Sequence, residues 1–141
     1  MFTRLTDNFR VAAQISLADV AAAKAQGLVR IINNRPDGEV PGQPSHAQIE
    51  AAAEAQGLDY HYIPITPGQF TPDQVAALQA ALADGQPTLA FCRSGTRSTL
   101  LWALVQATQG ADFADVAAIA AQGGYDIAPI APIFHALAAP K

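Results

Sequence analysis

Short apolar runs alternate along the chain with alanine-rich segments that open on a helix cap. The apolar runs predict strands over residues 9–15, 28–32, 60–65 and 88–91. Each of the first three runs is followed by a capping box, which pairs Ser16 with Asp19, Ser45 with Gln48 and Thr71 with Gln74. The capped segments predict helices that end near Gly27, Gly57 and Gly85, because glycine readily takes the backbone conformation that terminates a helix.

Three more helices are predicted over residues 99–106, from Asp112 to Gly123, and over residues 132–138. Strands that alternate with helices favour an α/β domain with a central, mostly parallel sheet flanked by helices. Since the sequence has no linker, repeat or charge block, we expect one domain over residues 1–141. The tail over residues 127–140 is expected either to pack on this domain or to cover the interface of a homo-oligomer.

Composition and charge narrow the classes of protein. The net charge of −4 argues against a general nucleic-acid binder. No apolar stretch approaches the ~20 residues that a membrane span needs, and the first residues lack the features of a signal peptide. We therefore expect a cytoplasmic protein with neither a nucleic-acid nor a membrane partner. The single cysteine, Cys92, argues against a disulfide framework, and without a tight His/Asp/Glu cluster we expect no metal and no other cofactor.

Cys92 occupies a position that is typical of ligand-binding and catalytic residues. Cys92 ends a predicted strand, and ligands of open α/β sheets bind at the carboxyl ends of strands. The backbone N–H groups of a glycine-containing loop and the start of the next helix attract anions and favour a thiolate. The predicted anion-binding loop therefore comprises Arg93, Ser94, Gly95 and Thr96, followed by Arg97 and Ser98. The alternatives are a buried structural cysteine and, for the two arginines, solvated surface charges.

A second loop, over residues 33–39, follows another predicted strand and should reach the same edge of the sheet. Asn34, Arg35 and Asp37 are therefore expected to border the site, with Asp37 as a candidate general acid or as the partner of Arg35. The alternative is an ordinary surface turn built on the Pro-Asp-Gly sequence. The aromatic side chains of the second half of the chain are expected to be packing residues: Trp102, Tyr125 and Phe134.

The loop from Cys92 resembles the signature of cysteine-dependent phosphatases, but it is one residue short. Four residues separate Cys92 from Arg97, where those phosphatases have five. In this spacing the loop is similar to the Cys-Arg-x-Gly-x-Arg loop of thiosulfate sulfurtransferases, the rhodanese type. Together with residues 33–39 and 63–65, it resembles the phosphatase-like domain of the beta-lactamase-hydrolase-like family over residues 1–110. The resemblance implies a three-layer fold like that of protein tyrosine and dual-specificity phosphatases, with residues 111–141 as C-terminal helices.

The resemblance also implies a catalytic role for three residues. Cys92 would be the nucleophile, Arg97 would stabilise the bound anion, and Ser98 would hydrogen-bond the cysteine sulfur. Members of the family are usually labelled sulfur transferases, which implies transfer of sulfur from thiosulfate or a low-molecular-weight persulfide to a thiol or cyanide through a persulfide of Cys92. The short loop favours this reading, as does the sequence Thr-Pro-Gly-Gln-Phe at residues 66–70, where phosphatases often have an acidic aspartate.

Two other functions stay open on the same residues. One is a cysteine-dependent phosphatase that hydrolyses phosphate esters, with Asp37 as its candidate acid. The other is a non-catalytic module that binds an anion or senses persulfides through Cys92. The three functions differ in what they do to a bound anion: sulfur transfer, ester hydrolysis or binding alone.

Overall fold

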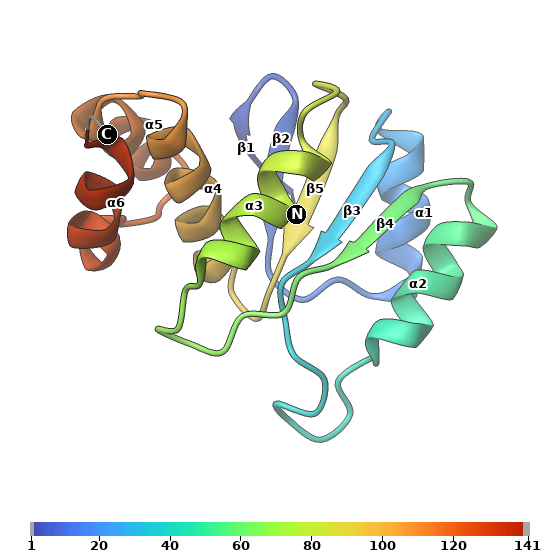
Figure 1. Ribbon diagram of the computed structural model, residues 1–141. Helices are drawn as coiled ribbons and strands as arrows, with labels where there is room; N and C mark the ends of the chain where they lie inside the picture. The colour runs from blue at the N-terminus through green and yellow to red at the C-terminus, as the bar shows by residue number, and fades with distance from the viewer. Residues whose placement is uncertain (1, 140–141) are drawn as a thin grey trace.

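Five short strands form one sheet in the order β1-β2-β5-β3-β4 (Figure 1). The strands are β1 (Thr3–Thr6), β2 (Phe9–Ala12), β3 (Arg30–Asn33), β4 (Asp59–Tyr62) and β5 (Thr88–Phe91). The computed structural model describes residues 2–139, so the ends of the predicted 1–141 domain, among them Pro140 of the predicted tail, lie outside the described residues. The strands β2, β5, β3 and β4 run parallel to one another, which confirms the mostly parallel sheet.

The strand β1 was not predicted from the sequence. It pairs with β2 in antiparallel fashion and forms one edge of the sheet. Of its four residues only Leu5 is buried, so it lacks the apolar run that identified the other strands. A hairpin at the edge of a sheet is stabilised by backbone pairing more than by burial, and its hydrophobic pattern is correspondingly weak.

The three capping boxes are confirmed. The helices α1 (Leu17–Ala25), α2 (His46–Ala55) and α3 (Pro72–Ala81) begin directly after Ser16, Ser45 and Thr71. In each, the cap side chain accepts a hydrogen bond from the third helical residue, and the side chain of that residue bonds back to the N–H of the cap. Local sequence alone therefore sets where these helices begin.

The second half of the chain is helical. Its elements are α4 (Thr96–Thr108), α5 (Phe113–Gln122), the 3-10 turn η1 (Ala128–Ile130) and α6 (Ala131–Ala138). Helix α4 begins three residues earlier than predicted, because its first turn grows directly out of the cysteine loop at Gly95. The segment after residue 126 packs on the domain, with Ile127, Ile130 and Phe134 all buried. Among residues 2–139, no helix is long and apolar enough to cross a membrane.

The helices cover both faces of the sheet, which gives three layers (Figure 1). Successive strand residues point to opposite faces. Ile31 and Leu89 pack in one hydrophobic cluster with residues of α1 and α2, whereas Ile32 and Ala90 pack in a second cluster with residues of α3, α4, α5 and α6. The three-layer arrangement expected from the resemblance is thus present.

The register of the parallel strands brings three chain segments to one point. Phe91, the last residue of β5, pairs with Ala12 at the end of β2 and with Asn33 at the end of β3. Cys92 follows Phe91, so the loops after β2 and β3 flank it on both sides. Two backbone hydrogen bonds close this junction, from Cys92 N–H to the carbonyl of Ala12 (3.3 Å) and from Asn34 N–H to the carbonyl of Phe91 (2.8 Å).

Candidate active site

Cys92 lies at the base of the loop that joins β5 to α4, and its side chain is fully buried. The backbone N–H of Gly95 donates a hydrogen bond to Cys92 Sγ over 3.1 Å. This geometry requires a φ of +92° at Gly95, a left-handed conformation that favours glycine. An N–H group aimed at sulfur stabilises a thiolate more than a thiol, because hydrogen bonds to charged acceptors are the stronger ones.

Arg97 belongs to the first turn of α4 and is a buried cation of the site. Its Nη1 donates to Glu39 Oε2 and to the carbonyl of Ile65, both over 2.7 Å, and its Nη2 donates to Glu39 Oε1 over 2.8 Å. Glu39 and the nearby Cys92 both raise the pKa of the guanidinium, so Arg97 stays charged. It therefore supplies a fixed positive charge next to the cysteine sulfur.

Glu39 is a site residue that the sequence analysis missed. Besides its two bonds to Arg97 it accepts one from Nε of Arg35 over 2.8 Å. Hydrogen bonds from Arg97, with a further contribution from Arg35, lower its pKa to about 2. At neutral pH Glu39 is therefore an anion that pairs with two arginines and cannot act as a general acid. Its place at the end of the 33–39 motif was the signal available in the sequence.

The predicted second loop does lie beside the cysteine loop, but its side chains pair differently from the expectation. Asn34 is fully buried; its amide donates to the carbonyl of Ile63 (2.9 Å) and accepts the hydroxyl of Ser98 (2.8 Å). The hydroxyl of Ser98 is thus directed to Asn34, whereas the resemblance implied a bond to the cysteine sulfur. The tie between Asn34 and Ser98 anchors the start of α4 on the end of β3.

Asp37 and Arg35 do not form the pair that was considered. Arg35 turns to Glu39 and also donates to Oε1 of Gln14 over 3.1 Å. Asp37 is exposed, and its carboxylate accepts the backbone N–H of His46 at the start of α2 over 2.7 Å. An anion at a helix N-terminus is stabilised by the free N–H groups there. In this structure the Asp37 carboxylate therefore binds the first turn of α2.

The exposed side of the loop opens on a cavity of about 380 Å³. Arg93, Ser94 and Thr96 are exposed and line it together with Arg97. The hydroxyls of Ser94 and Thr96 lie 3.0 Å apart. The rest of the lining comes from the loop after β4, from α4 and from the C-terminal segment: Pro67, Gly68, Phe70, Leu100, Pro129, Ile130 and Ile133.

Tyr125 combines the expected packing role with a contact to the cysteine loop. Its ring is half-buried and packs against the hydrophobic cluster that contains Trp102 and Phe134. Its hydroxyl donates to the carbonyl of Ser94 over 3.1 Å, a contact that the sequence analysis did not predict. Burial and the charge of Cys92 raise the pKa of Tyr125. No nearby motif marks this tyrosine in the sequence, because it comes from the segment between α5 and η1.

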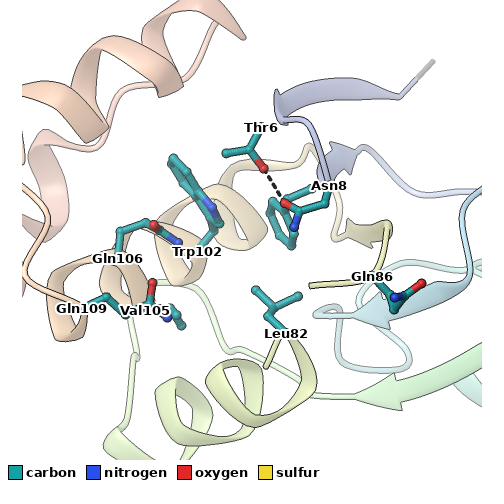
Figure 2. A pocket seen from close by; sticks show the side chains of 9 residues that line it. Thr6, Asn8, Leu82, Gln86, Trp102, Val105, Gln106 and Gln109 are labelled. Carbon is teal, nitrogen blue, oxygen red and sulfur yellow. Dashed lines mark hydrogen bonds between the residues drawn. The ribbon is translucent and has the colours of Figure 1, made fainter. Parts of the chain in front are cut away.

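A second cavity, of about 220 Å³, opens near the first residues of β2 and β5, away from the cysteine loop (Figure 2). Figure 2 shows side chains of its lining, among them Trp102, Leu82 and the amides of Asn8, Gln86 and Gln106. None of the side chains that line it is titratable.

Within residues 2–139 there is no group of three His, Cys, Asp or Glu side chains that would hold a metal ion.

Fold and site together define a class: a phosphatase-like α/β domain with a cysteine at the end of a central strand and an arginine in the following helix. A model of the phosphatase-like domain of beta-lactamase hydrolase-like proteins matches residues 1–109. The chain belongs to this family. It is 40% identical over 108 residues to a beta-lactamase hydrolase-like protein of Agrobacterium fabrum, an alignment that covers 76% of this chain and 25% of that protein. The chain thus spans about a quarter of the length of the curated relatives it matches.

Solved structures agree with this assignment. A candidate phosphatase from Neisseria meningitidis superposes with a TM-score of 0.82 at 28% identity, over 96% of each chain. The kinase associated phosphatase superposes with a TM-score of 0.75 at 16% identity, over 99% of this chain and 96% of that one. The latter likeness shows the fold alone. The fold is thus that of a phosphatase-like domain.

Proposed function

We propose that this chain is a cysteine-dependent phosphatase whose nucleophile is Cys92. The observation that carries the proposal is the loop itself, in which the Gly95 N–H points at Cys92 Sγ and Arg97 stands beside it. Family membership and the phosphatase-like neighbours support it. This reverses the order of preference drawn from the sequence, where sulfur transfer came first.

The reaction would run in two displacements. The Cys92 thiolate attacks phosphorus, an S–P bond forms, and the P–O bond to the alcohol breaks with its electron pair going to the leaving oxygen. Water then attacks the phosphocysteine, the S–P bond breaks, and phosphate and thiolate are released. The N–H groups of the loop and Arg97 stabilise the charge on the phosphoryl oxygens in both steps.

We expect neither Glu39 nor Asp37 to donate a proton to the leaving oxygen. Glu39 has a pKa of about 2 and stays ionised, and the carboxylate of Asp37 is bound to the start of α2. We therefore expect the enzyme to prefer esters whose alcohol leaves as a stable anion, such as phenols. Alkyl phosphates, whose leaving oxygen needs a proton, should be poor substrates.

Sulfur transfer is the second candidate, and the length of the loop favours it. Only four residues separate Cys92 from Arg97, which leaves a tighter cradle than the usual phosphatase loop. Cys92 thiolate would attack the outer sulfur of thiosulfate, sulfite would leave, and cyanide or a thiol would take the sulfur from the resulting persulfide. Sulfite leaves as a stable anion, so this reaction needs no acid.

One experiment distinguishes the candidates. The protein is incubated with 4-nitrophenyl phosphate and, separately, with thiosulfate and cyanide, and both turnover and protein mass are followed. The proposal expects release of nitrophenol and phosphate, inhibition by vanadate, and a loss of at least about a thousandfold in Cys92→Ser. Thiocyanate formation with one sulfur gained at Cys92 would support the second candidate instead. Binding of phosphate without turnover of either substrate would contradict both enzymatic functions and would support a non-catalytic anion-binding module.

A further inference from the structure

We infer that Tyr125 is a positioning residue of the site, whose hydroxyl orients the peptide unit that joins Ser94 to Gly95. In this orientation the N–H of the unit faces Cys92 Sγ. The effect on catalysis rests on the proposed function, whereas the orientation of the peptide unit can be measured without any turnover. Two hydrogen bonds at opposite ends of this unit carry the inference, together with the way in which the end of α5 places the tyrosine.

One peptide unit takes part in both hydrogen bonds. Its carbonyl, which belongs to Ser94, accepts the hydroxyl of Tyr125 over 3.1 Å. Its N–H, which belongs to Gly95, donates to Cys92 Sγ over 3.1 Å. The carbonyl and the N–H of a planar, trans peptide unit point in opposite directions. A partner that holds the carbonyl on one side of the loop therefore turns the N–H toward the sulfur on the other side.

The opposite orientation of this unit would impair the site. Glycine takes positive and negative φ about equally readily, so the unit before Gly95 can rotate at low cost. After such a rotation the Ser94 carbonyl would point to the sulfur in place of the N–H. A carbonyl dipole there would repel both a thiolate and a bound anion, whereas an N–H attracts them. The bond from Tyr125 stabilises the orientation that the reaction needs.

The two neighbouring carbonyls of the loop have partners of their own. The Arg93 carbonyl accepts the backbone N–H of Gln14 over 3.3 Å. The Gly95 carbonyl accepts both the N–H and the hydroxyl of Thr99, over 3.0 and 2.9 Å. The Ser94 carbonyl between them is bonded to a side chain from a distant segment. A substitution of that side chain therefore removes this bond and leaves the bonds on either side in place.

The end of α5 places Tyr125 beside the loop. Gly124 follows this helix with a φ of +88°, and its N–H donates to the carbonyl of Ala121 over 3.0 Å. The N–H of Tyr125 donates to the carbonyl of Ala120 over 2.9 Å. These two bonds form a Schellman motif, which ends a helix at a glycine and fixes the path of the chain after it. The ring of Tyr125 also packs against the hydrophobic core, so Tyr125→Phe should remove the hydroxyl and keep the ring in place.

The hydroxyl of Tyr125 is protonated at neutral pH and is therefore a donor. Burial, with a further contribution from the charge of Cys92, raises the pKa of Tyr125 above its ordinary value of 10.0. A hydrogen bond that the carbonyl of a peptide unit accepts also polarises the unit, which strengthens the bond that its N–H donates. Tyr125 thus acts on the cysteine sulfur through the peptide unit.

The test compares the wild type with Tyr125→Phe by the hydrogen exchange of single backbone amides, followed by NMR at neutral pH. We expect the Gly95 amide to exchange about fivefold faster in Tyr125→Phe, since this is the factor that one hydrogen bond supplies. The Thr99 amide, which donates to the Gly95 carbonyl, should keep its rate. The kcat/KM for 4-nitrophenyl phosphate should fall by a similar factor of about five.

The matched control is Tyr60→Phe, because the hydroxyl of Tyr60 also donates to a backbone carbonyl, that of His46 in α2. It should change neither the Gly95 exchange rate nor kcat/KM. Thermal unfolding shows that each variant is folded.

The outcomes separate this inference from the proposed function. An unchanged Gly95 exchange rate in Tyr125→Phe would overturn the inference, whatever the activity. An equal rise at Thr99 would also overturn it, because it would show a general loosening of the loop, and so would the same effects in Tyr60→Phe. Faster exchange at Gly95 with an unchanged kcat/KM would overturn the role in the reaction. A wild type without turnover would overturn the proposed function, while a faster Gly95 exchange in Tyr125→Phe upheld the orienting role.

Discussion

Gly95 is the residue on which the geometry of the cysteine loop depends most directly. Its φ of +92° turns its N–H toward Cys92 Sγ, at 3.1 Å. A Cβ placed on Gly95 would lie 2.2 Å from the hydroxyl oxygen of Tyr125. Both the conformation of the backbone and the position of the tyrosine therefore require a residue without a side chain.

Gly95→Ala should lower kcat/KM for an aryl phosphate by about tenfold or more, because the loop has to move away from Tyr125 and the N–H then misses the sulfur. The control is Gly110→Ala, at a φ of +83° with nothing within 4 Å of the added Cβ. It carries the same type of backbone strain outside the site and should keep the activity. Equal losses of activity in the two variants would contradict this role of Gly95.

At the scale of elements, one carboxylate joins the loop between β3 and α2 to the first turn of α4. Glu39 accepts two hydrogen bonds from Arg97, 58 residues away in sequence, and one from Arg35. The bond between Ser98 and Asn34 joins the same two elements. Arg97 is thus oriented by a neighbouring element as well as by its own helix.

Glu39→Gln should impair activity and stability together. The amide pairs with Arg97 more weakly, so we expect a loss of about ten- to hundredfold in kcat/KM from a misplaced guanidinium. Leaving buried Arg97 and Arg35 without their anion should cost about 3 kcal/mol in the free energy of unfolding. The measurements are steady-state kinetics and urea denaturation. Glu54→Gln, at an exposed position of α2, is the matched control, and an equal effect there would refute the assignment.

On the scale of the whole molecule, each buried arginine is paired with a carboxylate, and most of these pairs join distant parts of the chain. Arg30 of β3 bonds to Asp59 (2.9 Å) and to Asp84 (2.5 and 2.9 Å), at the opposite end of the strands from the cysteine loop. Arg30 lowers the pKa of Asp84 to about 2 and also lowers the pKa of Asp59. With Glu39, two such clusters stabilise the two ends of the sheet.

These pairs predict how stability depends on pH. Glu39 has a pKa of about 2 in the folded protein, against an ordinary value of 4.5, so the folded state binds its proton less readily. Its contribution to the free energy of unfolding is complete above about pH 4.5 and is lost as the pH falls toward 2. Urea denaturation across this range should show falling stability, with a shallower fall in Glu39→Gln. Identical slopes in the two proteins would show that Glu39 makes no such contribution.

Local sequence was sufficient for much of the fold. The caps at Ser16, Ser45 and Thr71 predicted three helix starts correctly, because a capping box is satisfied within four residues. The apolar run at residues 88–91 predicted β5, since a strand buried on both faces needs a continuous hydrophobic sequence. The edge strand β1 escaped notice because only Leu5 of its residues is buried.

By itself the sequence determined the family, the position of Cys92 after a central strand and the loop that follows it, because these features lie within a few consecutive residues. Only the tertiary structure decided that Glu39 rather than Asp37 pairs with the site arginines, that Ser98 bonds to Asn34, and that Tyr125 covers Gly95. It also brought the C-terminal Ile133 to the mouth of the site. The physical reason is that these contacts join residues far apart in the chain, and such pairings depend on how whole elements pack rather than on local sequence.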